Sequence, residues 1–179
     1  MSQMNEATRR QIMAARPDMS TWVSANAGSG KTKVLTDRVA RLLLDGTPPQ
    51  HILCLTYTKA AAAEMQNRLF KRLGGWAMLP DTELVTELSA LAPEKTLDTE
   101  TLRHARTLFA RAIETPGGLK IQTIHSFCSA LLRRFPLEAG VSPQFKEMDE
   151  RQSRRMIADI LEDIALGPRR DVIDAVALY

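Results

Sequence analysis

The segment that most constrains the fold is residues 24–32, SANAGSGKT, which stands between a β-prone stretch and an amphipathic helix. Residues 20–25, STWVSA, favour a strand, and beyond Lys31 the apolar residues recur at helical spacing. A strand that ends in a turn of small residues and opens a helix presents backbone N–H groups to an anion, and the helix dipole adds partial positive charge there. The segment therefore predicts a phosphate-binding loop.

The residue types in this loop suit a nucleotide. Gly28 and Gly30 can adopt backbone angles that are closed to other residues, which lets phosphate oxygens approach. Lys31 supplies a point charge for the β- and γ-phosphates, and Thr32 can place its hydroxyl on Mg²⁺. The strict motif has glycine where this chain has Ala25, so a plain flexible loop is the alternative, which the flanking strand and helix disfavour. The expected nucleotide contacts are Ala25, Asn26, Ala27, Gly28, Ser29, Gly30, Lys31, Thr32 and Lys33.

Strand and helix signals alternate along the chain, which predicts an α/β fold with a parallel sheet. Residues 51–57, HILCLTY, form a continuous apolar run that predicts a strand buried on both faces. Residues 59–73 predict a helix that Gly74 and Gly75 stop. The other expected elements are a helix at 8–15, a helix capped by Asp81, a helix from Thr99, a turn at 115–118, a strand at 119–124, helices at 125–135 and 149–166, and a helical segment at 170–179.

Composition adds weaker limits. The net charge of +3 permits a nucleic-acid partner but does not argue for one. Cys54 and Cys128 lie far apart in apolar segments, which fits buried thiols in a reducing compartment better than a disulfide. No apolar run approaches the ~18 residues that a membrane span needs, and the first residues have no apolar core like that of a signal peptide. We therefore expect a cytoplasmic protein with no membrane contact.

Four segments resemble the motifs of superfamily 1 DNA helicases of the UvrD/RecB kind. Residues 24–44, SANAGSGKTKVLTDRVARLLL, resemble the Walker A segment, in which that family commonly has alanine first and an internal glycine where Gly28 stands. Residues 52–65, ILCLTYTKAAAAEM, resemble motif Ia, and residues 121–135, IQTIHSFCSALLRRF, resemble motif Ib. Gln11 falls where the family's Q motif places a glutamine. The resemblance implies a RecA-like P-loop NTPase core that uses ATP and Mg²⁺, with Lys31 and Thr32 in catalytic roles.

The resemblance also implies individual contacts. Gln11 is expected to read adenine, because an amide can donate to one ring edge and accept from the exocyclic amine. The implied contacts to single-stranded DNA are Thr56, Tyr57, Thr58 and Lys59 in motif Ia, and Thr123, His125, Ser126 and Phe127 in motif Ib. Tyr57 fits a core position equally well. The family often has Asn-Lys where Lys59 alone follows, so the phosphate contact there stays open.

Several arginines have two interpretations. Arg103, Arg106 and Arg111 lie mostly off the apolar stripe of their helix, which fits a solvated face, or else a surface for duplex DNA or a partner. Arg133 and Arg134 either extend the basic track of motif Ib or are solvated.

The expected extent of the chain follows from what the sequence lacks. ATP hydrolysis needs a carboxylate pair for Mg²⁺ and an arginine for transition-state charge, and no apolar strand ending in Asp-Glu follows motif Ib. We therefore expect an N-terminal piece of a longer protein, inactive alone. Residues 1–135 would be the first half of a RecA-like ATP-binding domain (partial domain 1A) with a helical insertion at about 75–116. Residues 136–179 would begin the inserted helical subdomain 1B.

Within the family, the chain looks most like the AddA helicase–nucleases. The similarity lies in the residues of the loop, in the long insertion between motifs Ia and Ib, and in residues 133–145, RRFPLEAGVSPQF. That resemblance implies an ATP-dependent helicase, with a fused exonuclease as a further expectation, acting on DNA ends in double-strand break repair. It also implies activity at the bacterial nucleoid together with an AddB-like partner. The alternatives are a P-loop phosphotransferase and a non-catalytic nucleotide-binding scaffold domain.

Overall fold

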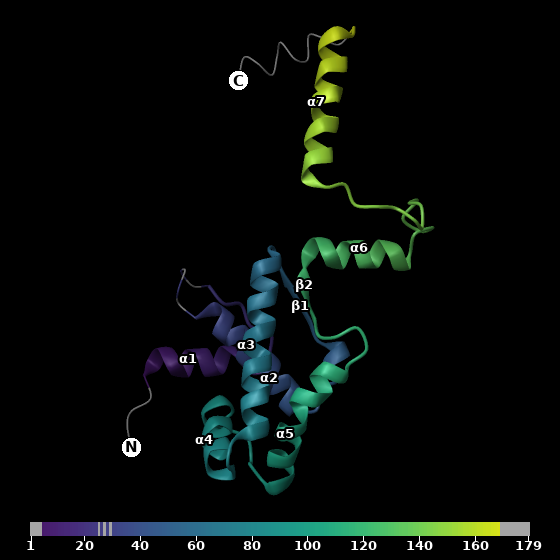
Figure 1. The fold of residues 1–179 in the computed structure, drawn as a ribbon. Coiled ribbons are helices and arrows are strands. Elements are labelled where there is room, and N and C mark those ends of the chain that lie inside the picture. Colours follow the sequence, from purple (N-terminus) through teal and green to yellow (C-terminus); the bar gives the residue numbers. More distant parts are fainter. Residues whose placement is uncertain (1–4, 25, 27, 29, 169–179) are drawn as a thin grey trace. The chain divides into compact units, whose positions relative to one another are not determined.

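The computed structural model describes residues 5–24, 26, 28 and 30–168 (Figure 1). They fall into two compact units, Met1–Phe127 and Cys128–Tyr179. Three residues of the predicted loop, Ala25, Ala27 and Ser29, lie outside the described residues, as does the helical segment predicted at 170–179.

Two parallel strands, β1 (Leu53–Thr56) and β2 (Lys120–Thr123), form the sheet of the first unit. Thr56 pairs with Thr123 in the register, so the two strands end side by side. The connection between the strands contains three helices, α3 (Lys59–Met78), α4 (Asp81–Leu91) and α5 (Thr99–Glu114). Two helices precede the sheet, α1 (Glu6–Ala14) and α2 (Lys31–Leu44), and a 3-10 turn at Pro49–His51 leads into β1. The prediction of an α/β fold with a parallel sheet is confirmed.

Two strand predictions are wrong. Residues 20–24 form no strand in the described structure, and Trp22 is 93% exposed. A β-prone sequence becomes a strand only where a neighbour accepts its hydrogen bonds and covers its side chains, and none of the described residues does so here. The strand at β1 is not buried on both faces either, since Leu53 and Leu55 are 43% and 45% exposed while Cys54 and Thr56 are half-buried.

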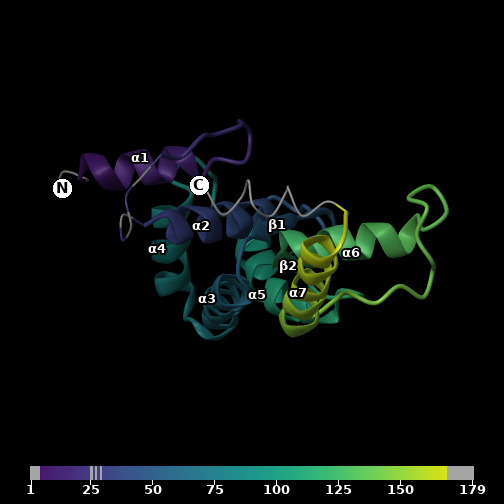
Figure 2. The ribbon, with the colours of Figure 1, turned by 90° about the horizontal axis from the view of Figure 1, so that it is seen from above.

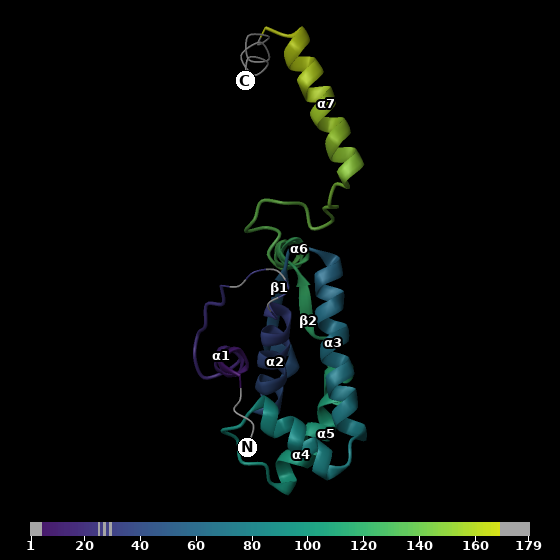
Figure 3. The ribbon, with the colours of Figure 1, turned by 90° about the vertical axis from the view of Figure 1, so that its left-hand side faces the viewer.

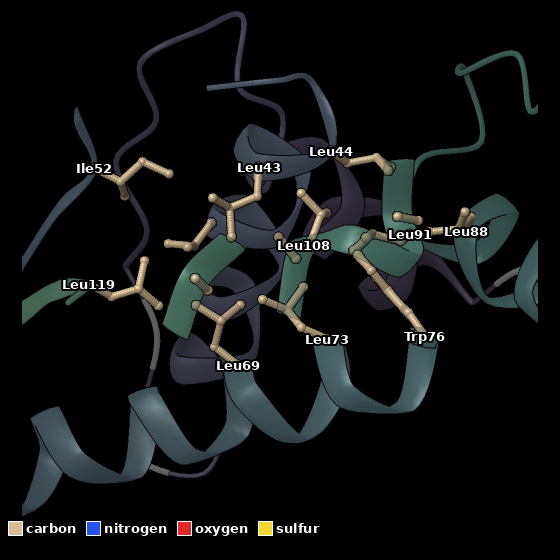
Figure 4. Packing of buried hydrophobic residues seen from close by; sticks show 14 of the residues in the cluster. Leu43, Leu44, Ile52, Leu69, Leu73, Trp76, Leu88, Leu91, Leu108 and Leu119 are labelled. Carbon is tan, nitrogen blue, oxygen red and sulfur yellow. The ribbon is translucent and has the colours of Figure 1, made fainter. Parts of the chain in front are cut away.

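The core of the first unit is built around one apolar stripe of α3. Leu69, Leu73 and Trp76 are almost inaccessible to solvent, and Figure 4 shows them directed toward side chains of α2, α4 and α5. α3 and α5 lie side by side, as Figures 1 and 2 both show. The cluster also holds Leu43, Leu88 and Leu108, and it extends to Ile52 and Leu119, the residues just before β1 and β2.

Helix α3 does not stop at Gly74 and Gly75 but continues to Met78, so this predicted boundary is wrong. The buried Trp76 continues the apolar stripe past the glycines, and the Phe109 ring packs against Gly74, where an added Cβ would lie 3.6 Å from the ring. The last carbonyls of α3 also have a donor. Arg106 donates to the carbonyls of Trp76 at 3.3 Å and Leu79 at 2.7 Å.

Arg106 therefore has a structural role rather than the solvated or partner-binding role considered from the sequence. Besides closing α3, its guanidinium donates to the Asp81 carboxylate at 2.6 Å. The predicted cap by Asp81 is wrong, because Pro80 occupies the N-cap position and Asp81 is the first helical residue of α4. Arg106 thus joins the end of α3 to the beginning of α4.

The second unit begins within α6 (Ile124–Arg134) and contains α7 (Glu150–Leu166). Asp149 and Gln152 form a reciprocal capping box at the start of α7. Arg133 lies 5.4 Å from the centre of the Phe145 ring and 3.8 Å from the Glu147 carboxylate, so it has local partners. Within the described ranges, no helix is both long and apolar enough to cross a membrane.

The two cysteines differ from each other. Cys54 in β1 is half-buried, and desolvation raises the pKa of its thiol. Cys128 in α6 is exposed, so the prediction of two buried thiols is wrong for this residue. Cys128 lies in a helix that has an exposed side. Because the helical period is 3.6 residues, apolar neighbours in the sequence can lie on the covered side while Cys128 lies on the exposed side.

We predict that Arg106→Met lowers the free energy of unfolding by roughly 1–3 kcal/mol, because it leaves carbonyls at the end of α3 without their donor. Urea unfolding followed by circular dichroism measures the change. Arg103→Met is the matched control, since Arg103 is an exposed arginine of the same helix, and its cost should stay within about 0.5 kcal/mol. Equal losses in the two variants would contradict this role of Arg106.

Candidate functional site

The chemistry-bearing segments of the first unit gather at one of its ends. α2 and α3 begin there, and β1 and β2 end there, as Figures 1 and 3 show. Ligands of parallel α/β sheets bind outside the carboxyl ends of the strands, where loops and helix N-termini meet. The loop before α2 and the segments after β1 and β2 are therefore the candidate site.

The two glycines of the loop before α2 have the backbone conformation that the sequence predicts for them. Gly28 and Gly30 have φ angles of +80° and +93°, in the left-handed region that favours glycine. The Lys31 ammonium donates to the backbone carbonyl of Asn26 at 2.7 Å, so it spans the loop. The side chain that the motif assigns to phosphate is thus held over the loop by a neutral acceptor.

Gln11 lies against this loop. A Cβ added to Gly30 would lie 2.8 Å from Nε2 of Gln11, so a residue other than glycine would displace the amide. Gln11 and Lys31 line the same surface cavity of about 620 Å³, between α1, residues 22–24 and α2. The structure therefore brings together the two residues that the sequence assigned to the base and to the phosphates.

Two arginines of α2 hold α1 and the segment after it. Arg38 donates to the carbonyls of Arg16 and, at 2.7 Å, Met19. Arg41 donates to the carbonyl of Ile12 at 3.1 Å. Neither residue was found from the sequence, where Arg38 and Arg41 look like solvated positions of an amphipathic helix. The placement of Gln11 thus depends on long-range contacts between α1 and α2.

Lys33 lies on another side of α2 from Lys31. Its ammonium contacts the Asp37 carboxylate at 2.6 Å, and the same carboxylate accepts from Arg72 of α3. Asp37 is 3% exposed, and these two cations compensate its burial. Asp37 is not among the residues predicted from the sequence, although its i,i+4 spacing from Lys33 is a signal for this ion pair. The structure places Lys33 toward α3, whereas Lys31 lines the cavity.

The segment after β1 presents one exposed aromatic side chain. Tyr57 is 83% exposed, so its interpretation as a core residue is wrong. Thr58 caps α3, because its hydroxyl accepts from the backbone N–H of Ala61 at 3.1 Å. Lys59 is the exposed first residue of the helix. The end of β1 therefore offers an aromatic ring and a cation beside a helix N-terminus.

The segment after β2 divides into capping residues and ring-bearing residues. Thr123 is 6% exposed, and its Oγ1 lies 2.8 Å from the Ser126 hydroxyl and accepts from the Ser126 backbone N–H at 3.1 Å. Thr123 therefore caps the start of α6, and the Ser126 hydroxyl bonds to this capping hydroxyl. His125 is exposed and Phe127 is half-buried. The end of β2 thus presents an imidazole to solvent, close in sequence to a partly covered aromatic ring.

The residues present fit a magnesium–nucleoside triphosphate. Two glycines with positive φ angles, Gly28 and Gly30, precede the helix, and backbone in this conformation can approach a phosphate closely. Lys31 lies at the loop, and Thr32 follows it in the first turn of α2. This donor set contains a cation, a hydroxyl and backbone amides, which are the groups that bind polyphosphate.

Comparison with known proteins agrees with this geometry. The family described as UvrD/REP helicase N-terminal domain matches residues 4–175. The chain is 34% identical over 158 residues to an ATP-dependent helicase/nuclease subunit from Lactobacillus gasseri, an alignment that covers 85% of this chain and 11% of that protein. It is 32% identical over 166 residues to the protein of the same name from Desulforudis audaxviator (91% and 12%). It is 32% identical over 159 residues to that of Enterococcus faecalis (89% and 10%). The chain thus spans about a tenth of the length of these relatives.

We predict that Gly30→Ala moves the Gln11 side-chain amide, because the new methyl group would lie 2.8 Å from its nitrogen. Nuclear magnetic resonance of the side-chain amides measures the shift. Gly28→Ala is the matched control, since Gly28 has a similar φ angle but no atom of the described residues lies within 4 Å of an added Cβ. Both variants incur the left-handed strain of roughly 1–2 kcal/mol, so only the Gln11 signal separates them. An equal shift in both would show that Gln11 does not contact Gly30.

Proposed function

The chain belongs to the UvrD/REP helicase N-terminal domain family, and on this premise we propose that it is the ATP-binding and single-stranded-DNA-binding part of an ATP-dependent DNA helicase. The observation that carries the proposal is the position of Gln11 against Gly30, in the cavity that Lys31 lines. A base-reading amide and a phosphate-binding ammonium then act on one nucleotide. The strand ends that carry motifs Ia and Ib lie at the same end of the unit.

ATP is held, in this proposal, by the backbone amides of residues 25–33 with Lys31, and Mg²⁺ by Thr32 and the phosphates. Lys31 would exchange the neutral Asn26 carbonyl for an anionic phosphate oxygen, and hydrogen bonds between ions are stronger than those to neutral acceptors. Gln11 would donate to and accept from the adenine edge. Bound ATP supplies the free energy of its hydrolysis, which drives closing and opening of the motor domains.

The domain assignment is part of the proposal. A parallel sheet with a helical crossover is the arrangement of a RecA-like core, so residues 1–135 are assigned to the first half of that core, partial domain 1A. The helical insertion at about 75–116 corresponds to the end of α3, α4 and α5. Residues 136–179, which include α7, are assigned to the start of subdomain 1B.

DNA contacts are assigned to the segments after the two strands. Tyr57 provides an exposed ring on which a base can stack, and Lys59 a charge for a phosphate. His125 and Phe127 are assigned the same role after β2. Thr58, Thr123 and Ser126 would act through their backbone and by holding the starts of α3 and α6, since the hydroxyls of Thr58 and Thr123 cap these helices and that of Ser126 bonds to Thr123. Thr56 ends the strand beside Thr123.

For the longer protein, we propose the function that the relatives' names describe, an ATP-dependent helicase/nuclease. It would act on DNA ends in double-strand break repair in the cytoplasm, at the bacterial nucleoid, as an AddA-type protein with an AddB-like partner. This chain alone would bind Mg²⁺-ATP weakly and hydrolyse it negligibly, because no apolar strand ending in Asp-Glu follows motif Ib in its sequence.

We predict that Lys31→Ala weakens binding of a fluorescent ATP analogue by roughly 10- to 100-fold, since a hydrogen bond to a charged group contributes about 1.5–3 kcal/mol. Titration of the full chain in the presence of Mg²⁺ measures the Kd. Lys71→Ala is the control, because Lys71 is an exposed lysine of α3 with no place in the cavity, and its Kd should equal that of the unchanged protein. Unchanged binding in Lys31→Ala would contradict the assignment of the loop.

We predict that Tyr57→Ala weakens binding of oligo(dT) by roughly 1–3 kcal/mol, the contribution of one stacked base. Fluorescence anisotropy at several salt concentrations should show an unchanged salt slope for Tyr57→Ala. The slope should fall by about 0.7 for Lys59→Ala if that residue binds one phosphate. Met78→Ala, at the other end of α3 and 85% exposed, controls for loss of any exposed apolar side chain. If Met78→Ala weakens binding as much as Tyr57→Ala, the proposed stacking is absent.

A further inference from the structure

Among the residues that the structure describes, Arg41 is the only buried cation. Its exposed fraction is 2%, and it lies in the third turn of α2, well past the phosphate-binding loop. Burial lowers the pKa of Arg41, so the charged guanidinium needs nearby acceptors to offset its desolvation. Neither the phosphate chemistry nor the DNA contacts assigned above make use of this residue.

The acceptors of Arg41 come from two regions that are far apart in the sequence. Its Nη1 donates to the carbonyl of Ile12 at 3.1 Å and to the carbonyl of Leu91 at 3.2 Å, and its Nη2 donates to the Glu94 carboxylate. Ile12 lies in the last turn of α1, and Leu91 is the last residue of α4. A cation at a helix C-terminus satisfies carbonyls that lack helical partners and interacts favourably with the dipole.

At the end of α1, this donor has a specific carbonyl to satisfy. The backbone N–H of Ala15 bonds to the Gln11 carbonyl at 3.0 Å, but the N–H of Arg16 bonds to the Met13 carbonyl at 3.1 Å. The Ile12 carbonyl therefore accepts from neither of these backbone N–H groups, and it accepts from Arg41 instead. Since Ile12 directly follows Gln11, fixing this carbonyl fixes the rotation of α1 about its axis and the direction in which the Gln11 side chain leaves the helix.

We propose that Arg41 is a positioning residue for Gln11, and that it makes the base preference of the nucleotide site depend on the end of α4. The inference rests on the proposed function, in which Gln11 reads adenine. The direct contact to the base belongs to Gln11, and Arg41 acts only through the backbone of α1. Through Leu91 and Glu94, the same guanidinium ties the helical insertion between motifs Ia and Ib to the nucleotide site.

The test is a double-mutant cycle on base preference. Fluorescent analogues of ATP and GTP carrying the same ribose-linked dye are titrated into the full chain, and the ratio of their Kd values is the readout. Gln11→Ala should reduce the preference for ATP, and Arg41→Met should reduce it by about fivefold, the effect of one misplaced hydrogen bond. Combined with Gln11→Ala, Arg41→Met should cause no further loss.

Arg106→Met is the matched control. Arg106 also donates to backbone carbonyls and one carboxylate, but its partners lie at the end of α3 and the beginning of α4, so its loss should lower stability and leave the base preference unchanged. Hydrogen exchange in the absence of nucleotide gives a second readout, in which Arg41→Met should speed exchange of the α1 amides and Arg106→Met should not. Should Arg41→Met not fold, Arg41→Lys keeps the charge without the forked donors and should reduce the base preference in the same way.

The outcomes separate the two proposals. A base preference that survives in Arg41→Met or Arg41→Lys, or that falls equally with and without Gln11, overturns the positioning role of Arg41. A base preference that survives in Gln11→Ala overturns the adenine contact in the proposed function, and the positioning role with it. A loss in Arg106→Met as large as in Arg41→Met shows general loosening and also overturns the inference.

Discussion

The apolar stripe of α3 is the interaction on which the rest of the first unit depends. Leu69, Leu73 and Trp76 are nearly inaccessible, and burying each side chain contributes roughly 1.5–3 kcal/mol. α3 starts shortly after β1, and α5 leads into β2, so the packing of α3 on α5 also brings the two strands together. The apolar core therefore positions the candidate site, although no described residue of the site belongs to that core.

Arginine side chains complete what the apolar core begins. Arg106 closes α3, and Arg41 closes both α1 and α4, in each case by donating to carbonyls that a helix end leaves without partners. Arg38 holds the chain after α1 in the same manner. The ion pairs of Asp37 with Lys33 and Arg72 add a link between α2 and α3. Charged side chains thus link α2 to α3, whose N-termini carry part of the site. Other arginines hold the C-terminal ends of α1, α3 and α4.

The elements that sequence reasoning predicted correctly are those with a local cause. The periodic stripe from Lys31 predicts α2, and the predicted helix at residues 149–166 matches α7. The errors lie where a distant residue decides the outcome. Gly74 does not end α3, because Trp76 is buried and Arg106 supplies donors further on. Residues 20–24 form no strand within the described structure, and β1 keeps an exposed face, because pairing and cover come from other elements and not from the sequence of the strand itself.

In the candidate site, too, some features have a local cause in the sequence and others depend on distant residues. From the sequence alone, Gly28 and Gly30 could be assigned the positive φ angles that they adopt, and the motifs placed Gln11, Tyr57 and Thr123 among the candidate residues. The position of Gln11 against Gly30 and the exposure of Tyr57 depend on tertiary structure. The same holds for the ion pair of Lys33 with Asp37 and for the contact of the buried Arg41 with the Ile12 carbonyl of α1. The physical reason is that backbone angles and helical periods are properties of neighbouring residues, whereas burial and the partners of charged groups depend on residues brought together only by folding.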